Sequence, residues 1–201
     1  MITPPDKTDE AFPGLLVLHI RRGDFQEHCV HLANWAADWN GFNAFPSLPD
    51  KFTPPSGGGG GSSTPETKEI YLKHCFPTIQ QIVDKVSEVK EGLRNVYVMT
   101  NEEVPWLEEL KVELMKVHKW DQVASTGDLE LSWEQKHIAQ TVDMMIGQRA
   151  QVFIGNGVRD LDPFMSWLYL MVRSLQFSSV TSNVVMLRML KGLPPESNRF
   201  W

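Results

Sequence analysis

The chain has 201 residues, of which 42% are apolar, so it can bury the core of one ordinary or large domain. Its formal net charge of −6, with no run rich in lysine and arginine, excludes a general nucleic-acid binder, which needs a basic face. The longest suspicious apolar stretch, residues 163–172, is too short to cross a bilayer, so we expect no membrane span.

The first elements in chain order are a polar start, a buried strand and a long loop. Residues 1–14 are polar and rich in proline, unlike a signal peptide, and we interpret them as a linker or a truncated start. Residues 15–20 are almost continuously apolar, as in a strand covered on both faces of a parallel sheet. Residues 23–65 show no helical periodicity, and the prolines and five consecutive glycines within 41–65 predict a flexible loop. The glycine run fits either an engineered linker or a natural low-complexity loop.

Helices and strands then alternate along the chain. Apolar residues from Tyr71 to Val89 recur at roughly helical spacing, and Gly92 is a typical helix stop. Residues 95–102 predict the next strand with its exit loop. The remaining predicted elements are an amphipathic helix at 106–118, a weak strand at 121–125, a helix at 132–150 and a strand at 151–157.

This order predicts an α/β fold, a Rossmann-like parallel sheet with flanking helices. Ligands of such sheets bind at the carboxyl ends of the strands, here in the segments HIRRGD, MTNE and IGNG. The guanidinium groups of Arg21 and Arg22 suit phosphate oxygens and can hold a diphosphate in a bidentate manner. The alternative interpretation is a solvated pair of loop arginines, or an adhesion-type Arg-Gly-Asp tripeptide.

Several motifs, in the same order, are similar to one known family. They are LHIRRGDF, VYVMTNE, VDMMIGQRAQVFIGNG and SSVTSNVVMLRMLKGLPPESNRFW. Together they resemble the GDP-fucose protein O-fucosyltransferase family, especially its fungal-type members. The resemblance implies that residues 15–201 form a Rossmann-like GDP-fucose-binding domain, the carboxyl-terminal half of a GT-B-like glycosyltransferase.

The resemblance also implies roles for individual residues. His19 is expected to help hold the guanine, Arg21 to lie on the diphosphate as the catalytic residue, and Arg22 to lie beside it. Asp143 matches the carboxylate that accepts hydrogen bonds from guanine. Asn101 matches a nucleotide-facing position that is often acidic in relatives. Amides and hydroxyls of a small-residue turn are expected to approach the phosphates; that turn consists of Ser178, Ser179 and Val180.

By the same resemblance, we expect a fucosyltransferase that moves fucose from GDP-fucose to a protein or glycan hydroxyl. The transfer is expected to be inverting and to need no metal or other cofactor, because two arginines take the place of a divalent cation. Each fixed donor of this kind stabilises the departing charge by on the order of 3 kcal/mol. The alternatives are a non-catalytic nucleotide-sugar-binding or interaction module of the same fold, and a transferase that uses another GDP-sugar.

The sequence departs from the family pattern in two ways. Residues 158–176 match nothing in the pattern, and Val158 and Gln176 stand where an in-frame intron would place its ends, so we hypothesise a translated retained intron. The acceptor-binding half and any signal or anchor are also missing from the sequence. We therefore interpret the chain as a fragment or a truncated gene model from a protein of the secretory pathway (ER or Golgi), and leave open whether the chain is active by itself.

Cys29 and Cys75 are the only cysteines, and their spacing does not fit a zinc site. They fit equally a disulfide formed in an oxidising compartment and two unpaired, partly buried thiols. Asp24 and Glu27 are weaker candidates for a general base that would activate the acceptor hydroxyl.

Overall fold

A five-stranded, all-parallel sheet in the order β3-β2-β1-β4-β5 forms the centre of the molecule. The computed structural model describes residues 11–23, 25–37, 47–156 and 179–201, apart from the side chains of residues 179, 180, 182 and 183. The strands are β1 (Phe12–Ile20), β2 (Asn95–Thr100), β3 (Gln122–Ser125), β4 (Ala150–Gly155) and β5 (Asn198–Phe200). The predicted Rossmann-like α/β fold is confirmed, and β5 is a strand that the sequence analysis missed.

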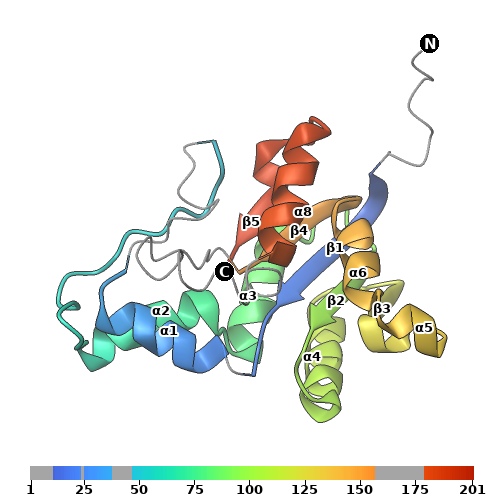
Figure 1. Ribbon diagram of the computed structural model, residues 1–201. Helices are drawn as coiled ribbons and strands as arrows, with labels where there is room; N and C mark the ends of the chain where they lie inside the picture. The colour runs from blue at the N-terminus through green and yellow to red at the C-terminus, as the bar shows by residue number, and fades with distance from the viewer. Residues whose placement is uncertain (1–10, 24, 38–46, 157–178) are drawn as a thin grey trace.

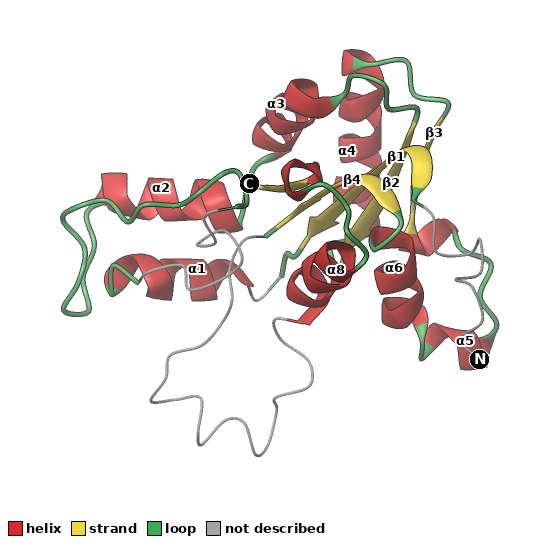
Figure 2. Ribbon diagram, turned by 90° about the horizontal axis from the view of Figure 1, so that it is seen from above, coloured by secondary structure: helices red, strands yellow, loops and turns green. Residues whose placement is uncertain are grey.

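Helices cover both faces of this sheet (Figure 2). One face carries α3 (Ile79–Val89) and α4 (Val104–Val117), and the other carries α6 (Ala139–Gly147) and α8 (Ser179–Leu190). Leu16 and Leu18 of β1 pack into the first core, whereas Val17 packs into the second. Burial on both faces explains why the β1 sequence is apolar almost without interruption. None of the helices in the described part of the chain combines the length and apolar character needed to span a membrane.

Two antiparallel helices, α1 (Phe25–Asn34) and α2 (Pro65–Cys75), project from the carboxyl end of β1 (Figure 1). They share a small core in which a disulfide joins Cys29 to Cys75. The expectation of a continuous loop over residues 23–65 is therefore wrong where α1 forms. The buried positions of α1 are Phe25, Cys29 and Ala33, and two of these side chains are so small that they give little hydrophobic signal.

Asp50 anchors the loop that leads into α2. Its carboxylate accepts hydrogen bonds from Lys85 on α3, from Arg199 on β5 and from the backbone N–H of Phe200. Burial alone would raise the pKa of Asp50, but these donors lower it to about 2. The loop is thus tied to two elements of the domain.

The glycine run in the same loop packs against the end of α1. The backbone N–H of Gly59 donates to the carbonyl of Asn34 at 3.1 Å. A Cβ atom on Gly58 would lie 2.8 Å from the carbonyl oxygen of Ala33, so only glycine fits there. These contacts favour a natural loop over an engineered linker. Residues 41–46 of the predicted flexible segment lie outside the described residues.

Two predicted helices are each divided in the structure. The helix expected from Tyr71 to Val89 breaks after α2, because Pro77 has no N–H and Thr78 starts α3 with a capping box. The helix expected at 132–150 consists of α5 (Trp133–Lys136) and α6, with Ile138 in a non-helical conformation between them. Two short 3₁₀ helices, η3 (Thr126–Asp128) and η4 (Pro195–Ser197), complete the described elements.

Candidate active site

Two asparagines fix the backbone of residues 21–23 where the chain leaves β1. Asn156, directly after β4, accepts a hydrogen bond from the N–H of Arg21 at 3.0 Å. Asn101, directly after β2, accepts from the N–H of Arg22 at 2.7 Å and donates to its carbonyl oxygen at 3.2 Å. Gly23 has a φ of +67°, which a residue with a side chain rarely adopts. The loop is therefore held from both strands that neighbour β1.

Asn156 also connects this loop to the helical pair. Its side chain is only 4% exposed, and its Nδ2 donates to the carbonyl oxygen of Cys75 at 2.8 Å. The amide thus uses its acceptor for Arg21 and a donor for the end of α2, next to the disulfide. An aspartate at this position would leave the Cys75 carbonyl oxygen without its donor, and a leucine would leave both groups without a partner.

The Arg22 guanidinium is held by the protein itself. Its Nε donates to Glu102 at 2.8 Å, and its Nη1 donates to the carbonyl oxygen of Pro77 at 2.8 Å. Its Cζ atom lies 3.8 Å from the ring centroid of Phe76 and 4.6 Å from that of Trp106. The hydrogen bond from Arg22 lowers the pKa of Glu102. These contacts support a positioning role, and the predicted contact of Arg22 with the diphosphate stays a prediction.

The Arg21 side chain is half-buried at the carboxyl end of β1, with its Cζ atom 4.9 Å from the ring centroid of Phe25. Because Asn156 fixes the backbone of Arg21, its guanidinium starts from a defined position at the sheet edge where ligands of such folds bind. The contact of Arg21 with a diphosphate, which the resemblance implies, stays a prediction.

His19 lies just before the arginines on the face that α8 covers. Its Nδ1 lies 2.6 Å from the hydroxyl oxygen of Thr181 on α8. Burial, with a smaller contribution from the charge of Arg21, lowers the pKa of His19 to about 4, so the ring is neutral at pH 7. A Cβ atom on Gly155 would lie 2.7 Å from the Thr181 hydroxyl oxygen, so glycine there lets α8 approach β4.

Asp143 is half-buried on α6 and is held by two hydroxyl groups. The phenol of Tyr97 on β2 donates to its Oδ1 at 2.7 Å, and the hydroxyl of Thr126 lies 2.9 Å from each carboxylate oxygen. Burial raises the pKa of Asp143, and the two hydrogen bonds act against that effect. His19 is in register with Met99, two residues beyond Tyr97, so Asp143 and His19 lie at different levels of the sheet.

Comparison with known proteins shows the family to which the chain belongs. The sequence model of the GDP-fucose protein O-fucosyltransferase family matches residues 12–167. The chain belongs to this family. No curated protein sequence matches it.

One solved structure with a similar fold is the crystal structure of POFUT1 in complex with GDP, with a TM-score of 0.50 and 18% sequence identity. The match covers 95% of this chain and 42% of the POFUT1 chain, so this O-fucosyltransferase-family chain spans less than half of that protein. At this identity, the likeness shows a common fold.

Within this O-fucosyltransferase domain, the structure brings several predicted site residues to the carboxyl ends of the strands. His19, Arg21 and Asn101 lie there, and Asp143 lies on the same face as His19. Ser179 and Val180 form the first turn of α8, without described side chains, whereas Ser178 and the insertion at 158–176 lie outside the described residues. The roles assigned to these residues stay predictions.

Two further residues of the site, Asn156 and Thr181, were not predicted from the sequence. Asn156 is the asparagine of the IGNG strand exit, and Thr181 stands in the SSVTSN segment, so both lie in segments that carried the resemblance. Their partners are 135 and 162 residues away in sequence, so only the folded chain shows what they contact.

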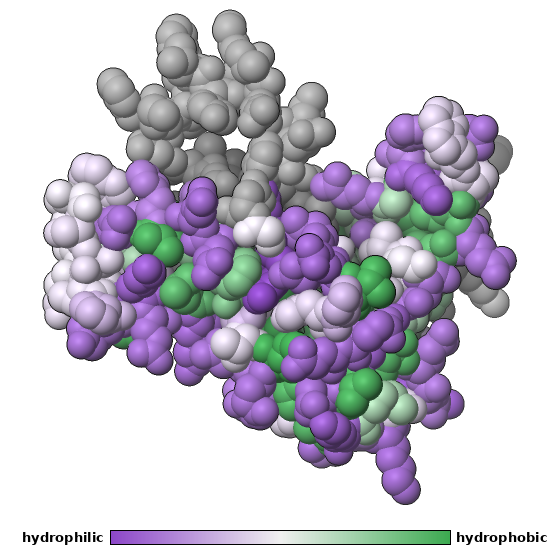
Figure 3. Space-filling view, turned by 90° about the horizontal axis from the view of Figure 1, so that it is seen from below, coloured by the Kyte–Doolittle hydropathy of each residue, from purple (hydrophilic) through white to green (hydrophobic). Residues whose placement is uncertain are grey.

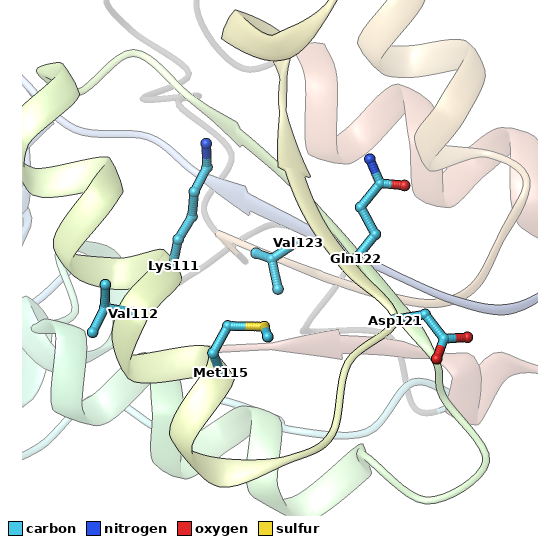
Figure 4. Close-up of a pocket in the computed structure, with 6 residues that line it drawn as sticks. All are labelled: Lys111, Val112, Met115, Asp121, Gln122 and Val123. Carbon is cyan, nitrogen blue, oxygen red and sulfur yellow. The ribbon is translucent and has the colours of Figure 1, made fainter.

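A surface hollow of about 400 Å³ lies elsewhere, between α4 and the beginning of β3 (Figure 4). Its lining residues are Lys111, Val112, Met115, Asp121, Gln122 and Val123. In a parallel sheet, the beginning of β3 is at the edge opposite the strand exits, so we do not assign this hollow to the active site. The face seen from below is mostly hydrophilic, with small separate apolar patches (Figure 3).

Proposed function

We propose that this chain is the donor-binding part of a fucosyltransferase, which binds GDP-fucose at the carboxyl ends of β1, β2 and β4. The observation that carries the proposal is the fixed Arg21 backbone at these strand exits, in a chain of the GDP-fucose protein O-fucosyltransferase family. The acceptor is a hydroxyl group of a protein or a glycan. The POFUT1 structure with bound GDP supports a guanine nucleotide as the ligand of this fold.

The reaction breaks the bond between the anomeric carbon of fucose and the diphosphate. The acceptor oxygen forms the new bond to that carbon and releases its proton to the solvent, while GDP departs with the bonding electrons. Arg21 stabilises the negative charge that develops on the departing diphosphate, because its guanidinium is a cation that can donate two parallel hydrogen bonds. We propose that the acceptor oxygen attacks the anomeric carbon from the face opposite the diphosphate, which makes the transfer inverting. We also propose that Arg21 makes the transfer independent of a metal or another cofactor.

The residues around Arg21 have separate roles in binding the donor. His19 is neutral at pH 7, so it serves as a hydrogen-bonding group and adds no second charge next to Arg21. Arg22, Glu102 and Asn101 keep the loop in place. Asp143 recognises the guanine base with its carboxylate. Glu27 is exposed on α1, and Asp24 lies outside the described residues, so neither gains support as the general base.

We also propose that the protein works in the secretory pathway. The Cys29–Cys75 disulfide supports this location, because disulfides persist in oxidising compartments such as the ER lumen.

The catalytic part of the proposal is tested by hydrolysis of GDP-fucose, since water can replace the acceptor. The chain is incubated with GDP-fucose labelled in the sugar, with and without EDTA, and the released fucose is separated and counted. We expect release above the protein-free rate, with no effect of EDTA. Binding of GDP without release would favour the non-catalytic module, and faster release from another GDP-sugar would favour a different donor.

A further inference from the structure

We propose that Tyr97 and Thr126 are positioning residues that set guanine specificity by fixing the Asp143 carboxylate in one orientation. This inference rests on the proposed function, because it takes Asp143 to be the group that recognises the base. It adds two residues to which the resemblance assigned no role: a tyrosine in the middle of β2 and a threonine in η3.

The two hydroxyls hold the carboxylate from different elements. Oδ1 of Asp143 accepts from Tyr97 at 2.7 Å, and the Thr126 hydroxyl is within 2.9 Å of both oxygens. A threonine hydroxyl carries a single hydrogen, so Oδ2 receives at most a share of that bond from Thr126. Of the hydrogen bonds that the described residues donate to Asp143, most therefore go to Oδ1. Oδ2 keeps lone pairs that can accept hydrogen bonds from a ligand.

The ring of Tyr97 is well suited to fix this orientation. Its side chain is 5% exposed and packs in the core with Val17, Met99 and Val184, so the phenol oxygen has little freedom to move. Thr126 follows β3 directly, and β3 pairs with β2 in register. Both donors are thus attached to neighbouring strands, and their relative positions are set by the sheet.

Recognition of guanine needs an ionised, correctly oriented carboxylate. Guanine presents two adjacent N–H donors on one edge, whereas adenine presents an acceptor at the matching ring nitrogen, so a fixed carboxylate favours guanine. Burial of Asp143 opposes ionisation, and donated hydrogen bonds stabilise the ionised form. The same two hydroxyls therefore support both the charge and the orientation that base recognition requires.

The experiment compares GDP with inosine diphosphate (IDP), which keeps the ring N–H and lacks the exocyclic amino group. Calorimetry measures both affinities for the unchanged chain, for Tyr97→Phe and for Thr126→Val. Each substitution removes a hydroxyl and keeps most of the packing. The matched control is Tyr71→Phe, because Tyr71 is also buried and its phenol donates to the carbonyl oxygen of Ala37, on the helical pair. Circular dichroism verifies that each variant is folded.

We expect Tyr97→Phe and Thr126→Val each to weaken GDP binding about tenfold and IDP binding less, so that the GDP preference over IDP falls at least about threefold. Tyr71→Phe is expected to leave GDP affinity and the preference unchanged. A GDP preference over IDP that survives in a folded Tyr97→Phe or Thr126→Val variant would overturn the inference and leave the proposed function standing. An unchanged chain that binds GDP no better than ADP would instead overturn the proposed function, and this inference with it.

Discussion

Replacing Arg21 with alanine is expected to slow the release of fucose from GDP-fucose by about 100-fold, because the departing diphosphate loses its fixed cationic donor. The affinity for guanosine, which has no phosphate, is expected to stay within about twofold of the original value. Labelled GDP-fucose measures the rate, and calorimetry measures the guanosine affinity.

Asp143→Ala is expected to reverse the relative size of these two effects. It removes the proposed base-recognition group, so it should weaken guanosine binding more than it slows the chemical step at saturating donor. Arg94→Ala is a charge control, because Arg94 pairs with Asp121 on the exposed surface and should change neither quantity. Equal effects of Arg21→Ala and Asp143→Ala on both quantities would contradict the division of roles.

Arg188→Leu is expected to lower the free energy of unfolding by about 3–5 kcal/mol. Arg188 lies on α8 with no exposed surface. Its guanidinium donates to the side chains of Asn198 and Ser197 and to carbonyl oxygens at both ends of the α6–β4 turn. Leucine would leave these buried acceptors without a donor.

In the described part of the chain, the groups that accept hydrogen bonds from Arg188 are neutral oxygens. Arg188 therefore acts as a hydrogen-bond donor there and not as one partner of a salt bridge. Burial lowers the pKa of Arg188 to about 10, and the group remains protonated at pH 7. Urea unfolding at pH 7, followed by tryptophan fluorescence, gives the free energy for Arg188→Leu and for the exposed control Arg94→Leu. A loss below about 1 kcal/mol for Arg188→Leu would show that α8 does not depend on this network.

The sheet could be predicted from the sequence because its inner strands are buried on both faces. Residues 15–20 and 95–100 are apolar enough to identify strands without any knowledge of their neighbours. β5 escaped prediction because it has three residues, too few for a pattern. The break at Pro77 was present in the sequence, but the helical spacing on either side concealed it.

The candidate site was predictable in part. The motifs placed His19, Arg21 and Asp143 near one ligand, but sequence could not distinguish the environments of the two adjacent arginines. That difference depends on Glu102 and Trp106, which reach Arg22 only through the packing of β2 and α4 against β1. Local sequence patterns predict the helices and strands and the loops where the strands end. The contacts that hold the side chains of the site in place depend on residues far apart in sequence.

The central claim is that the strand exits form a site for a guanine nucleotide diphosphate. The most direct test is calorimetric titration of the chain with GDP, ADP and UDP under identical conditions. We predict one GDP site per chain, with an affinity at least about tenfold higher than that for ADP or UDP. Equal affinities for the three nucleotides, or no heat of binding with GDP, would contradict the account.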